Sequence, residues 1–376
     1  MTHISVDPDG LDEYSVVFTS RSVNHMSRIF CEAMCDISTS LKKTYAADSV
    51  AIVPGGGTYG MEAIARLFGN GVKCLILQNG WFSYRWQQIL ETGSISSDVI
   101  IMHATYEARD GIDKYRPVEI NDVVQSILVE KPEVVFAPHV ETSSGVLLPD
   151  DYLTQVSSAV HSYGGILVLD CIASGAQWVD MKCIGVDVLI TAPQKGWSST
   201  PCAAAVLLSE HAGAIASSLK SSSFSCDLNK WLFIMREYEA GRYAYHATMP
   251  TDGLMQFRDA IVETRKVGIE ALRCAQQELG GKIRAMLTRA GFISIAAEGF
   301  QSESVIVCHT DQAEIKNGSL FAQVGVQVAG GVPLMCGEPE GFSTFRIGLF
   351  GLDKLTNIDA TVERLEHAIK DVVAIV

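Results

Sequence analysis

The sequence of 376 residues is poor in charge and contains no run of basic residues. Only 19% of the residues are charged, and acidic residues outnumber basic ones 43 to 29, which gives a formal net charge of −14. Because nucleic-acid binding depends on clustered Lys and Arg, this balance argues against a nucleic-acid partner. With 48% hydrophobic residues, the chain is long enough to bury a large core and to form more than one domain.

Several common signatures are also missing. The ten cysteines are irregularly spaced and form no CxxC pair, and no HExxH motif occurs, so we expect no metal site. The first ten residues are polar and acidic, unlike a secretory signal, so we expect reduced thiols in a cytoplasmic protein. The longest uncharged run, Asn317–Gly337, contains five glycines and a proline, which makes it a poor membrane span.

What the sequence does contain is an alternation of short apolar runs with amphipathic stretches, between about residues 48 and 209. The apolar runs predict buried strands at Ser49–Val53, Val72–Leu77, Asp98–Met102, Glu133–Ala137, Gly165–Leu169, Val186–Ile190 and Ala203–Leu208. The stretches between them predict helices at Thr58–Phe68, Trp81–Glu91, Glu119–Glu130 and Pro149–Ser162. This alternation is typical of an α/β fold with a mostly parallel sheet covered by helices. The connection between the last two strands is too short for a crossover helix, so we expect that pair to be antiparallel.

The pattern changes after residue 253. A long helical stretch, about Leu254–Ala290, is expected to precede strands at Glu303–His309, Val326–Ala329 and Phe345–Leu349. A closing helix is expected at Asn357–Ile375. We therefore predict an N-terminal segment at residues 1–47, a large domain at 48–253, and a connecting helix with a small C-terminal α/β domain at 254–376.

A glycine-rich turn follows the first predicted strand, at the position where parallel sheets bind ligands. Gly55–Gly57 lead into Thr58, where a helix is expected to begin, and such a turn suits a phosphate group. A tight strand-to-helix turn without a ligand is the alternative. The turn also matches GxGxxG, but Gln78 and Asn79 stand where a nicotinamide-binding fold needs an acidic residue.

Asp170 and Lys195 lie beyond the ends of two further predicted strands. A buried carboxylate needs a cation or strong donors, and a lysine on such a loop is a candidate Schiff-base nucleophile, although either residue alone has an ordinary structural explanation. Together with the glycine turn they make up the set that pyridoxal phosphate needs. The Asp keeps the pyridine nitrogen protonated, the Lys forms the Schiff base, and Trp81 or Phe82 supplies a stacking aromatic ring.

Six ordered blocks of the sequence resemble the class V aminotransferases of fold type I, in particular the alanine–glyoxylate, serine–pyruvate and 2-aminoethylphosphonate–pyruvate group. The blocks are Val53–Ala63, Asn79–Phe82, His139–Val146, Val168–Ser174, Thr191–Gly196 and Phe345–Gly348. Their order and separations fit over about residues 24–376. The resemblance implies a transaminase that moves an amino group from a small amino acid, aminophosphonate or aminosulfonate to glyoxylate or pyruvate, with residues 48–253 binding pyridoxal phosphate.

The resemblance also implies roles for individual residues. Lys195 would be the Schiff-base lysine that moves a proton between substrate and cofactor, Asp170 the partner of the pyridine nitrogen, and Arg346 the residue that binds the α-carboxylate. The implied cofactor contacts are Gly56, Gly57, Thr58, Phe82, Thr142, Asp170, Gln194, Lys195, Tyr245 and Thr248. Since the family sends the stretch containing Tyr245 and Thr248 to the phosphate of a neighbouring subunit, a homodimer with shared active sites is implied.

One departure and two alternatives accompany the resemblance. The family's usual N-terminal Pro-Gly-Pro-type segment is not recognisable, and residues 18–27 occupy its place, where Arg21 or Asn24 could contact substrate or serve in helix capping. A lyase or cysteine desulfurase using the same cofactor is the alternative enzyme, with Cys336 as the cysteine to test. A cofactor-binding regulator would require a basic DNA-binding extension, and the 47 residues before the first strand are not basic.

Overall fold

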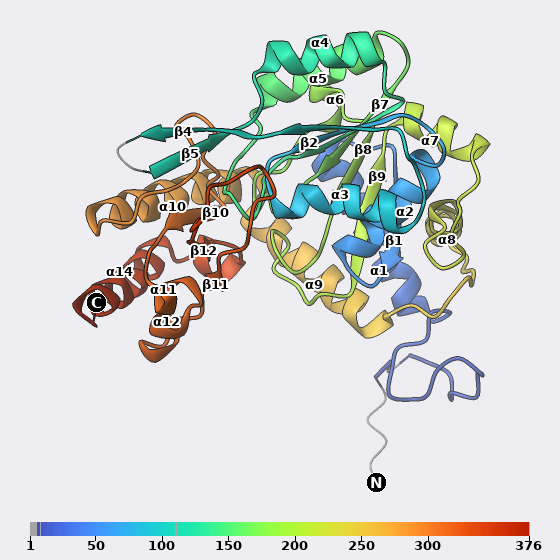
Figure 1. Ribbon diagram of the computed structural model, residues 1–376. Helices are drawn as coiled ribbons and strands as arrows, with labels where there is room; N and C mark the ends of the chain where they lie inside the picture. The colour runs from blue at the N-terminus through green and yellow to red at the C-terminus, as the bar shows by residue number, and fades with distance from the viewer. Residues whose placement is uncertain (1–5, 8, 110–111, 376) are drawn as a thin grey trace.

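The computed structural model describes residues 6–7, 9–109 and 112–375, and its main feature is a sheet of seven strands (Figure 1). The strand order is β1-β9-β8-β7-β6-β2-β3. The strands are β1 (Ser49–Pro54), β2 (Cys74–Gln78), β3 (Val99–His103), β6 (Val134–Pro138), β7 (Ile166–Asp170), β8 (Val188–Thr191) and β9 (Ala203–Leu208). Each lies within two residues of a predicted strand, because a fully buried strand gives a continuous apolar run.

The strand directions bring the carboxyl ends of the parallel strands to one edge of this sheet. β2 is parallel to β3 and β6, β6 to β7, and β7 to β8. β9 is antiparallel to β8, as predicted, and also antiparallel to β1, which was not predicted. Since β9 lies between β1 and β8, those two strands run in the same direction. The carboxyl ends of β1, β2, β6, β7 and β8 therefore share one edge.

Helices cover both faces of the sheet (Figure 1). α2 (Gly57–Phe68) and α3 (Trp81–Thr92) cover one face, and α4 (Ile120–Glu130) and α5 (Asp150–His161) cover the other. On α3, Trp86 is fully buried and stacks on Phe136 of β6, with ring centroids 4.4 Å apart. Aromatic stacking of this kind fixes the helix on the sheet and hence positions its first turn.

The N-terminal segment contributes a helix that the sequence analysis did not predict. α1 (Arg28–Tyr45) buries Phe30, Met34, Ile37 and Leu41, whose spacing places them on one face. It packs on β1, on α8 (Leu228–Glu239) and on α9 (Thr251–Val267). The short helices α6 (Met181–Ile184) and α7 (Glu210–Ser218) complete this part of the chain.

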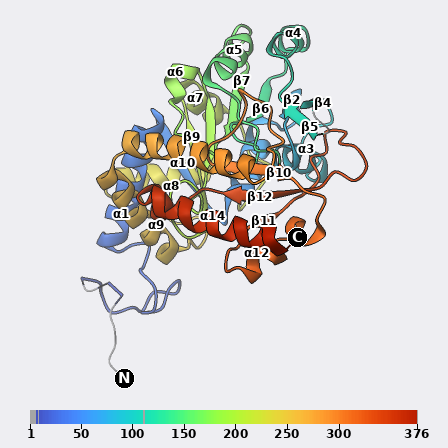
Figure 2. The ribbon, with the colours of Figure 1, turned by 90° about the vertical axis from the view of Figure 1, so that its left-hand side faces the viewer.

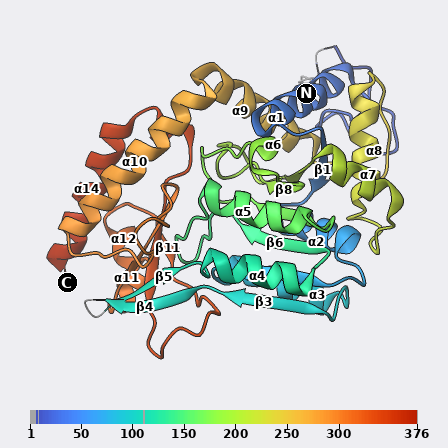
Figure 3. The ribbon, with the colours of Figure 1, turned by 90° about the horizontal axis from the view of Figure 1, so that it is seen from above.

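The helical stretch expected at about Leu254–Ala290 is helical in the structure, but it is divided into two helices. α9 ends at Val267, and α10 (Ile269–Arg289) begins after Gly268, whose φ of +103° lies outside the helical region. A residue with a side chain would be strained at that angle, so the glycine produces the break. Figure 3 shows the resulting change of direction between α9 and α10.

A second sheet of three antiparallel strands lies in the C-terminal part, in the order β10-β12-β11. Its strands are β10 (Val305–His309), β12 (Thr344–Gly348) and the two-residue β11 (Ala329–Gly330). The strand expected at Val326–Ala329 is therefore wrong in position and length. The helices here are α11 (Ala313–Lys316), α12 (Ser319–Gln323), α13 (Leu352–Leu355) and α14 (Ile358–Ile375). α10 and α14 lie side by side (Figures 2 and 3).

A hairpin that was not predicted leads from the edge of the large sheet toward the second sheet (Figure 3). It is formed by β4 (Thr105–Arg109) and β5 (Ile112–Arg116). The Tyr115 N–H donates to the Ile295 carbonyl at 2.7 Å, and the Ala297 N–H donates to the Tyr115 carbonyl at 2.8 Å. These bonds tie the hairpin to the segment that precedes β10.

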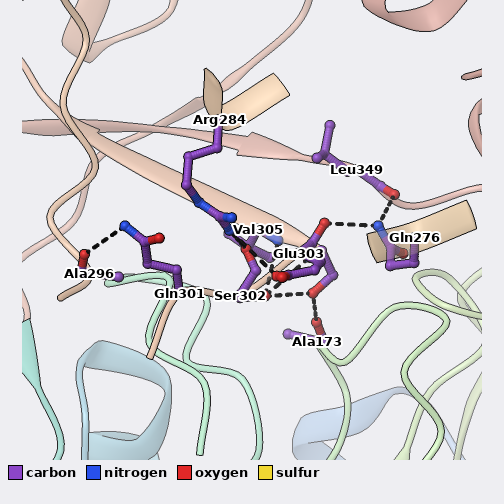
Figure 4. A network of polar contacts seen from close by, with 10 residues as sticks. Ala173, Gln276, Arg284, Ala296, Gln301, Ser302, Glu303, Val305 and Leu349 are labelled. Atoms are coloured by element: carbon purple, nitrogen blue, oxygen red, sulfur yellow. Dashed lines mark hydrogen bonds and ion pairs between the residues drawn. The ribbon is translucent and has the colours of Figure 1, made fainter. Parts of the chain in front are cut away.

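A polar network joins the second sheet to the loop that follows β7 (Figure 4). Gln276 on α10 is fully buried; its Oε1 accepts from the Ala176 N–H at 3.2 Å and its Nε2 donates to the Glu303 carbonyl at 2.9 Å. The Ser304 hydroxyl donates to the Ala173 carbonyl at 2.7 Å. Because buried amides and hydroxyls need such partners, the network fixes the second sheet against the β7 loop.

Candidate active site

The shared carboxyl edge of the large sheet carries most of the predicted site residues. Among the residues that the structure describes, a cavity of about 210 Å³ opens at this edge. The predicted site residues that line it are Gly57, Thr58, Phe82, Thr142, Asp170, Gln194 and Lys195. Gly56 lies next to it as the residue before α2. Residues that follow β1, β2, β6, β7 and β8 thus meet in one place.

The glycine turn forms one end of the cavity. α2 begins at Gly57, and no side chain caps this helix, so its first N–H groups are available to an anion. A Cβ at Gly57 would lie 2.4 Å from Cδ1 of Ile172 in the loop after β7. The turn therefore needs glycine because another loop closes over it. This arrangement suits a phosphate group at the helix N-terminus.

Asp170 lies at the carboxyl end of β7 and is 9% exposed. Within the described chain, the hydrogen bond found for its carboxylate comes from the Ile172 N–H, which lies 2.9 Å from Oδ1. Burial raises the pKa of Asp170 to about 6, and the nearby Lys195 partly offsets that rise. A buried carboxylate with spare acceptor capacity is suited to hold a protonated group.

Lys195 is placed beside Asp170 by a close approach of two loops. A Cβ at Gly196 would lie 2.2 Å from the Gly175 carbonyl oxygen, so the loop after β8 touches the loop after β7. Burial lowers the pKa of Lys195; Asp170 raises it and Arg346 lowers it further. A lowered lysine pKa increases the fraction of neutral amine, which is the nucleophilic form.

Phe82 is surrounded by three cationic side chains. Lys195 Nζ lies 5.7 Å, Arg346 Cζ 5.6 Å and Arg85 Cζ 5.1 Å from the centroid of the Phe82 ring. Distances of this size are typical of cation–π contacts. The neighbouring Trp81 is not among the residues that line the cavity. Of the two aromatic candidates, the structure therefore places Phe82 at the site.

Arg346 lies on β12 and reaches the site from the second sheet. Its Nε donates to the Gly330 carbonyl at 2.9 Å, which fixes the side chain and leaves both terminal nitrogens of the guanidinium for another partner. Burial lowers the pKa of Arg346, and Glu141 partly offsets this effect. A guanidinium held in this way presents two parallel donors, which is the arrangement that binds a carboxylate.

The sequence analysis missed the role of Glu141, which holds the first turn of α3 in place. Its fully buried carboxylate accepts from the backbone N–H groups of Phe82 at 3.2 Å and Ser83 at 2.9 Å. It also accepts from the Ser83 hydroxyl at 2.7 Å, the Ser143 N–H at 3.0 Å and the Ser143 hydroxyl at 2.7 Å. A carboxylate at a helix N-terminus is favoured by the dipole and by the free N–H groups. Glu141 therefore fixes the backbone that carries Phe82.

Arg85 is the second residue that the sequence analysis missed. It lies one helical turn after Phe82 on α3 and lines the cavity. Its Nη1 donates to the Thr58 hydroxyl at 3.0 Å. The only sequence signal was the spacing of three from Phe82, which puts both side chains on one helix face.

The comparisons with known proteins agree with this geometry. The family described as aminotransferase class-V matches residues 11–340. The chain belongs to this family. Alanine–glyoxylate aminotransferase from Callithrix jacchus is 27% identical to this class-V aminotransferase over 261 residues, 67% of this chain and 60% of the relative. The small subunit of a soluble hydrogenase from Synechococcus sp. is 24% identical over 355 residues, 93% of this chain and 87% of the relative.

The fold is shared with solved aminotransferases. The crystal structure of an alanine–glyoxylate aminotransferase from Nostoc sp. superposes with a TM-score of 0.78 at 20% identity, covering 94% of this chain and 89% of that one. A ureidoglycine–glyoxylate aminotransferase from Bacillus subtilis gives the same TM-score at 19% identity, covering 94% and 87%. The predicted fold type I architecture is confirmed.

Class-V aminotransferases use pyridoxal phosphate, and the residues present here fit that cofactor. The glycine turn at the start of α2 suits its phosphate, and the spare acceptor capacity of the buried Asp170 suits its ring nitrogen. Lys195, with its lowered pKa, suits its aldehyde. The prediction of a pyridoxal-phosphate-dependent aminotransferase is confirmed.

Tyr245 and Thr248 are not brought to the cavity within one chain. Tyr245 is 55% exposed, and its hydroxyl lies 3.2 Å from the Thr248 hydroxyl. Neither residue lines the cavity. Their role at a neighbouring subunit's phosphate stays a prediction.

Cys336 does not have the properties that the desulfurase alternative needs. It is 8% exposed, and burial raises its pKa to about 12. Its thiol donates to the Gln78 carbonyl at 3.4 Å. A desulfurase needs a mobile, ionisable cysteine, so this buried thiol favours the transaminase.

Proposed function

We propose that this chain transfers the amino group of a small amino donor to glyoxylate or pyruvate, with Lys195 as the Schiff-base residue. The observation that carries the proposal is the meeting of Lys195, Asp170 and Phe82 around one cavity, although they come from three separate elements. Arg346 approaches the same place from the second sheet, with its Cζ 5.6 Å from the centroid of the Phe82 ring. The alanine–glyoxylate and ureidoglycine–glyoxylate aminotransferases among the similar proteins support glyoxylate as one acceptor.

Pyridoxal phosphate, when bound, supplies a carbonyl carbon that accepts the amino group and a protonated ring that delocalises negative charge. Lys195 Nζ would hold and move the proton between the substrate α-carbon and the cofactor. Its lowered pKa increases the fraction of neutral amine, which is the form that accepts a proton.

Asp170 and Arg346 would orient the two partners of the reaction. The Asp170 carboxylate would keep a proton on the ring nitrogen, because a buried anion stabilises a positive charge next to it. The free terminal nitrogens of Arg346 would bind the α-carboxylate of the amino donor and then that of the oxo acid. Both substrates of a transamination carry that group, so one arginine can serve both half-reactions.

We further propose a cytoplasmic homodimer with shared sites, in which Tyr245 and Thr248 of one subunit complete the phosphate site of the other. The exposure of Tyr245 supports this proposal, because the pair is free for contact with a second subunit. All ten cysteines are free thiols, as expected in a reducing compartment. Among the described residues, no helix has the length and hydrophobicity to cross a membrane.

The direct test is a panel of amino donors with glyoxylate and pyruvate. Each donor is added to the holoenzyme, and the absorbance is followed as the cofactor changes from its aldehyde-derived to its amine-derived form. We expect at least one donor to produce the change and one oxo acid to reverse it. If no donor produces it, the proposal is wrong.

A Lys195→Ala variant tests the assignment of the nucleophile. We expect it to lose the absorbance band that borohydride bleaches in the wild type, because Lys195 is the only lysine among the described residues that line the cavity. Lys220→Ala is the matched control, because Lys220 is an exposed lysine. This variant should retain the band. A reducible band in Lys195→Ala would contradict the assignment.

Mixed dimers test the shared sites. Lys195→Ala and a Tyr245→Ala/Thr248→Ala double variant are each expected to have little activity. When the two are refolded together, hybrid dimers would contain one site with neither defect, so activity should return. No recovery in a hybrid shown to form would contradict the proposal.

A further inference from the structure

Arg85 has no carboxylate partner, although its charge lies inside the site. Within the described chain no ion pair is found for it, and its hydrogen bond to the neutral Thr58 hydroxyl is 3.0 Å long. The residues three and four positions away on α3 are Trp81, Phe82, Gln88 and Ile89, so the helix offers no acidic neighbour. The side chain lines the cavity without an ion-pair partner in the described chain, so its charge is available to an anion from outside the chain.

The position of Arg85 is fixed before any ligand binds. Its guanidinium lies 5.1 Å from the Phe82 ring centroid, and its Nη1 contacts Thr58 in the first turn of α2. Phe82 is in turn held by the backbone hydrogen bond to Glu141. Contacts on two sides limit the rotamers of a long side chain, so little entropy is lost when it binds a ligand.

The contact with Thr58 also determines which way that hydroxyl can donate. An arginine N–H can only donate, so the Thr58 oxygen accepts from Arg85 and its own proton remains free. A free O–H next to the uncapped N-terminus of α2 is a donor for a phosphate oxygen. Arg85 and Thr58 thus present donors to the same end of the cavity.

We propose that Arg85 is part of the phosphate site, supplying its permanent positive charge and orienting the Thr58 hydroxyl. The proposal rests on the proposed function, because it takes pyridoxal phosphate as the ligand. A phosphate monoester carries a charge of about −1.5 to −2 at neutral pH, which an uncharged glycine turn does not balance. Arg346 would bind the substrate carboxylate and Arg85 the phosphate. Each of the two arginines beside the Phe82 ring would therefore bind a different anion.

The test compares two ligands that differ only in the phosphate. Apoenzymes of the wild type, Arg85→Met and Arg85→Lys are titrated with pyridoxal phosphate and with pyridoxal. Since a charge-assisted hydrogen bond contributes about 1.5–3 kcal/mol, Arg85→Met should bind pyridoxal phosphate about 10–100-fold more weakly. Its affinity for pyridoxal should stay within about threefold of the wild type, and Arg85→Lys should lie between.

Arg364→Met is the matched control, because Arg364 is an exposed arginine on α14. It should leave both affinities unchanged. Equal losses for the two ligands in Arg85→Met would overturn the proposal, since they would mean that Arg85 acts through Phe82 or the fold. Unchanged affinity for pyridoxal phosphate would overturn it as well.

A measurement on the wild type makes the test independent of whether Arg85→Met folds. The apoenzyme is treated with an arginine-specific dicarbonyl reagent with and without inorganic phosphate, and the modified residues are mapped. We expect phosphate to protect Arg85 but not Arg364; absence of protection at Arg85 would overturn the proposal. A wild type that binds no pyridoxal phosphate would instead refute the proposed function, so the two failures are distinguishable.

Discussion

Glu141 and Asp170 are buried carboxylates that follow two neighbouring strands, β6 and β7, yet their surroundings differ. Glu141 accepts five hydrogen bonds from Phe82, Ser83 and Ser143. Asp170 accepts one from the Ile172 N–H within the described chain. The hydrogen-bonding capacity of the Glu141 carboxylate is thus used by donors of the protein itself. The Asp170 carboxylate can still accept hydrogen bonds from a ligand in the cavity that it lines.

This difference separates a positioning residue from a binding residue. A carboxylate whose oxygens are all used by backbone and hydroxyl donors stabilises the fold, because the cost of its burial is offset locally. A carboxylate with an open oxygen is unfavourable in the empty protein and becomes favourable when a cationic group arrives. Four predictions, made with three substitutions, would break or sharpen the comparison.

The largest expected effect is the loss of activity in Asp170→Asn. The amide cannot stabilise a protonated ring nitrogen, so we expect kcat to fall by about 10³-fold without a loss of thermal stability. Steady-state kinetics and thermal denaturation of the same preparation measure both quantities. A large loss of stability with intact kcat would reverse the assignment of the two carboxylates.

The next effect is the loss of stability in Glu141→Gln. The amide nitrogen would face N–H and O–H donors of the α3 turn, so two buried donors would lose their acceptor. At about 1–3 kcal/mol for each donor, we expect the free energy of unfolding to fall by about 2–6 kcal/mol. Urea denaturation measures this loss, and Glu363→Gln, at an exposed position of α14, serves as the control. A variant as stable as the control would show that the hydrogen bonds at Glu141 add nothing.

A smaller effect is the pH dependence of the apoprotein. The pKa of Asp170 is raised to about 6 in the folded state, above the value of about 4 in the unfolded chain, so the folded state binds more protons between these values. Its ionisation therefore lowers stability as the pH rises from about 4 to 6. We expect apo Asp170→Asn to gain about 2 kcal/mol relative to the wild type between pH 4.5 and pH 8. Parallel stability curves across this range would refute the expectation.

The smallest effect is expected for Ser143→Ala. The Ser143 hydroxyl donates to Glu141 at 2.7 Å and accepts from the Trp81 N–H at 2.9 Å. Four other donors remain on Glu141, so the loss should be about 1 kcal/mol. Ser158→Ala on the exposed face of α5 is the control, with an expected change below about 0.5 kcal/mol. A loss as large as that of Glu141→Gln would mean that the serine, and not the carboxylate, holds the turn.

Much of the large sheet could be predicted from the sequence because its strands are buried on both faces. The apolar runs around β6 and β7 are uninterrupted. They end at Pro138 and Asp170, and candidate site residues lie at or directly after these ends. Asp170 and Lys195 could be found for the same reason: a charge directly after an apolar strand is conspicuous. The break at Gly268 was missed because glycine is tolerated within amphipathic helices and their periodicity continues on both sides of it.

The parts of the site that escaped prediction depend on contacts between distant segments. Glu141 acts on α3, about 60 positions earlier, and Arg85 acts on Thr58 in a different helix. The β4–β5 hairpin and α1 were missed as well, since short half-exposed strands and a helix of mixed composition give weak periodic signals.

The sequence by itself determined the fold class, the cofactor and which residues after the strand ends belong to the candidate site. Buried strands require apolar residues, so a polar or charged residue directly after such a strand can be recognised in the sequence. Tertiary structure alone decided that Cys336 is buried and that Glu141 holds the first turn of α3. It also decided that Arg85 donates a hydrogen bond to Thr58, directly after the glycine turn. These facts depend on how helices and loops pack across the sheet, and no local pattern encodes a distance between segments far apart in the chain.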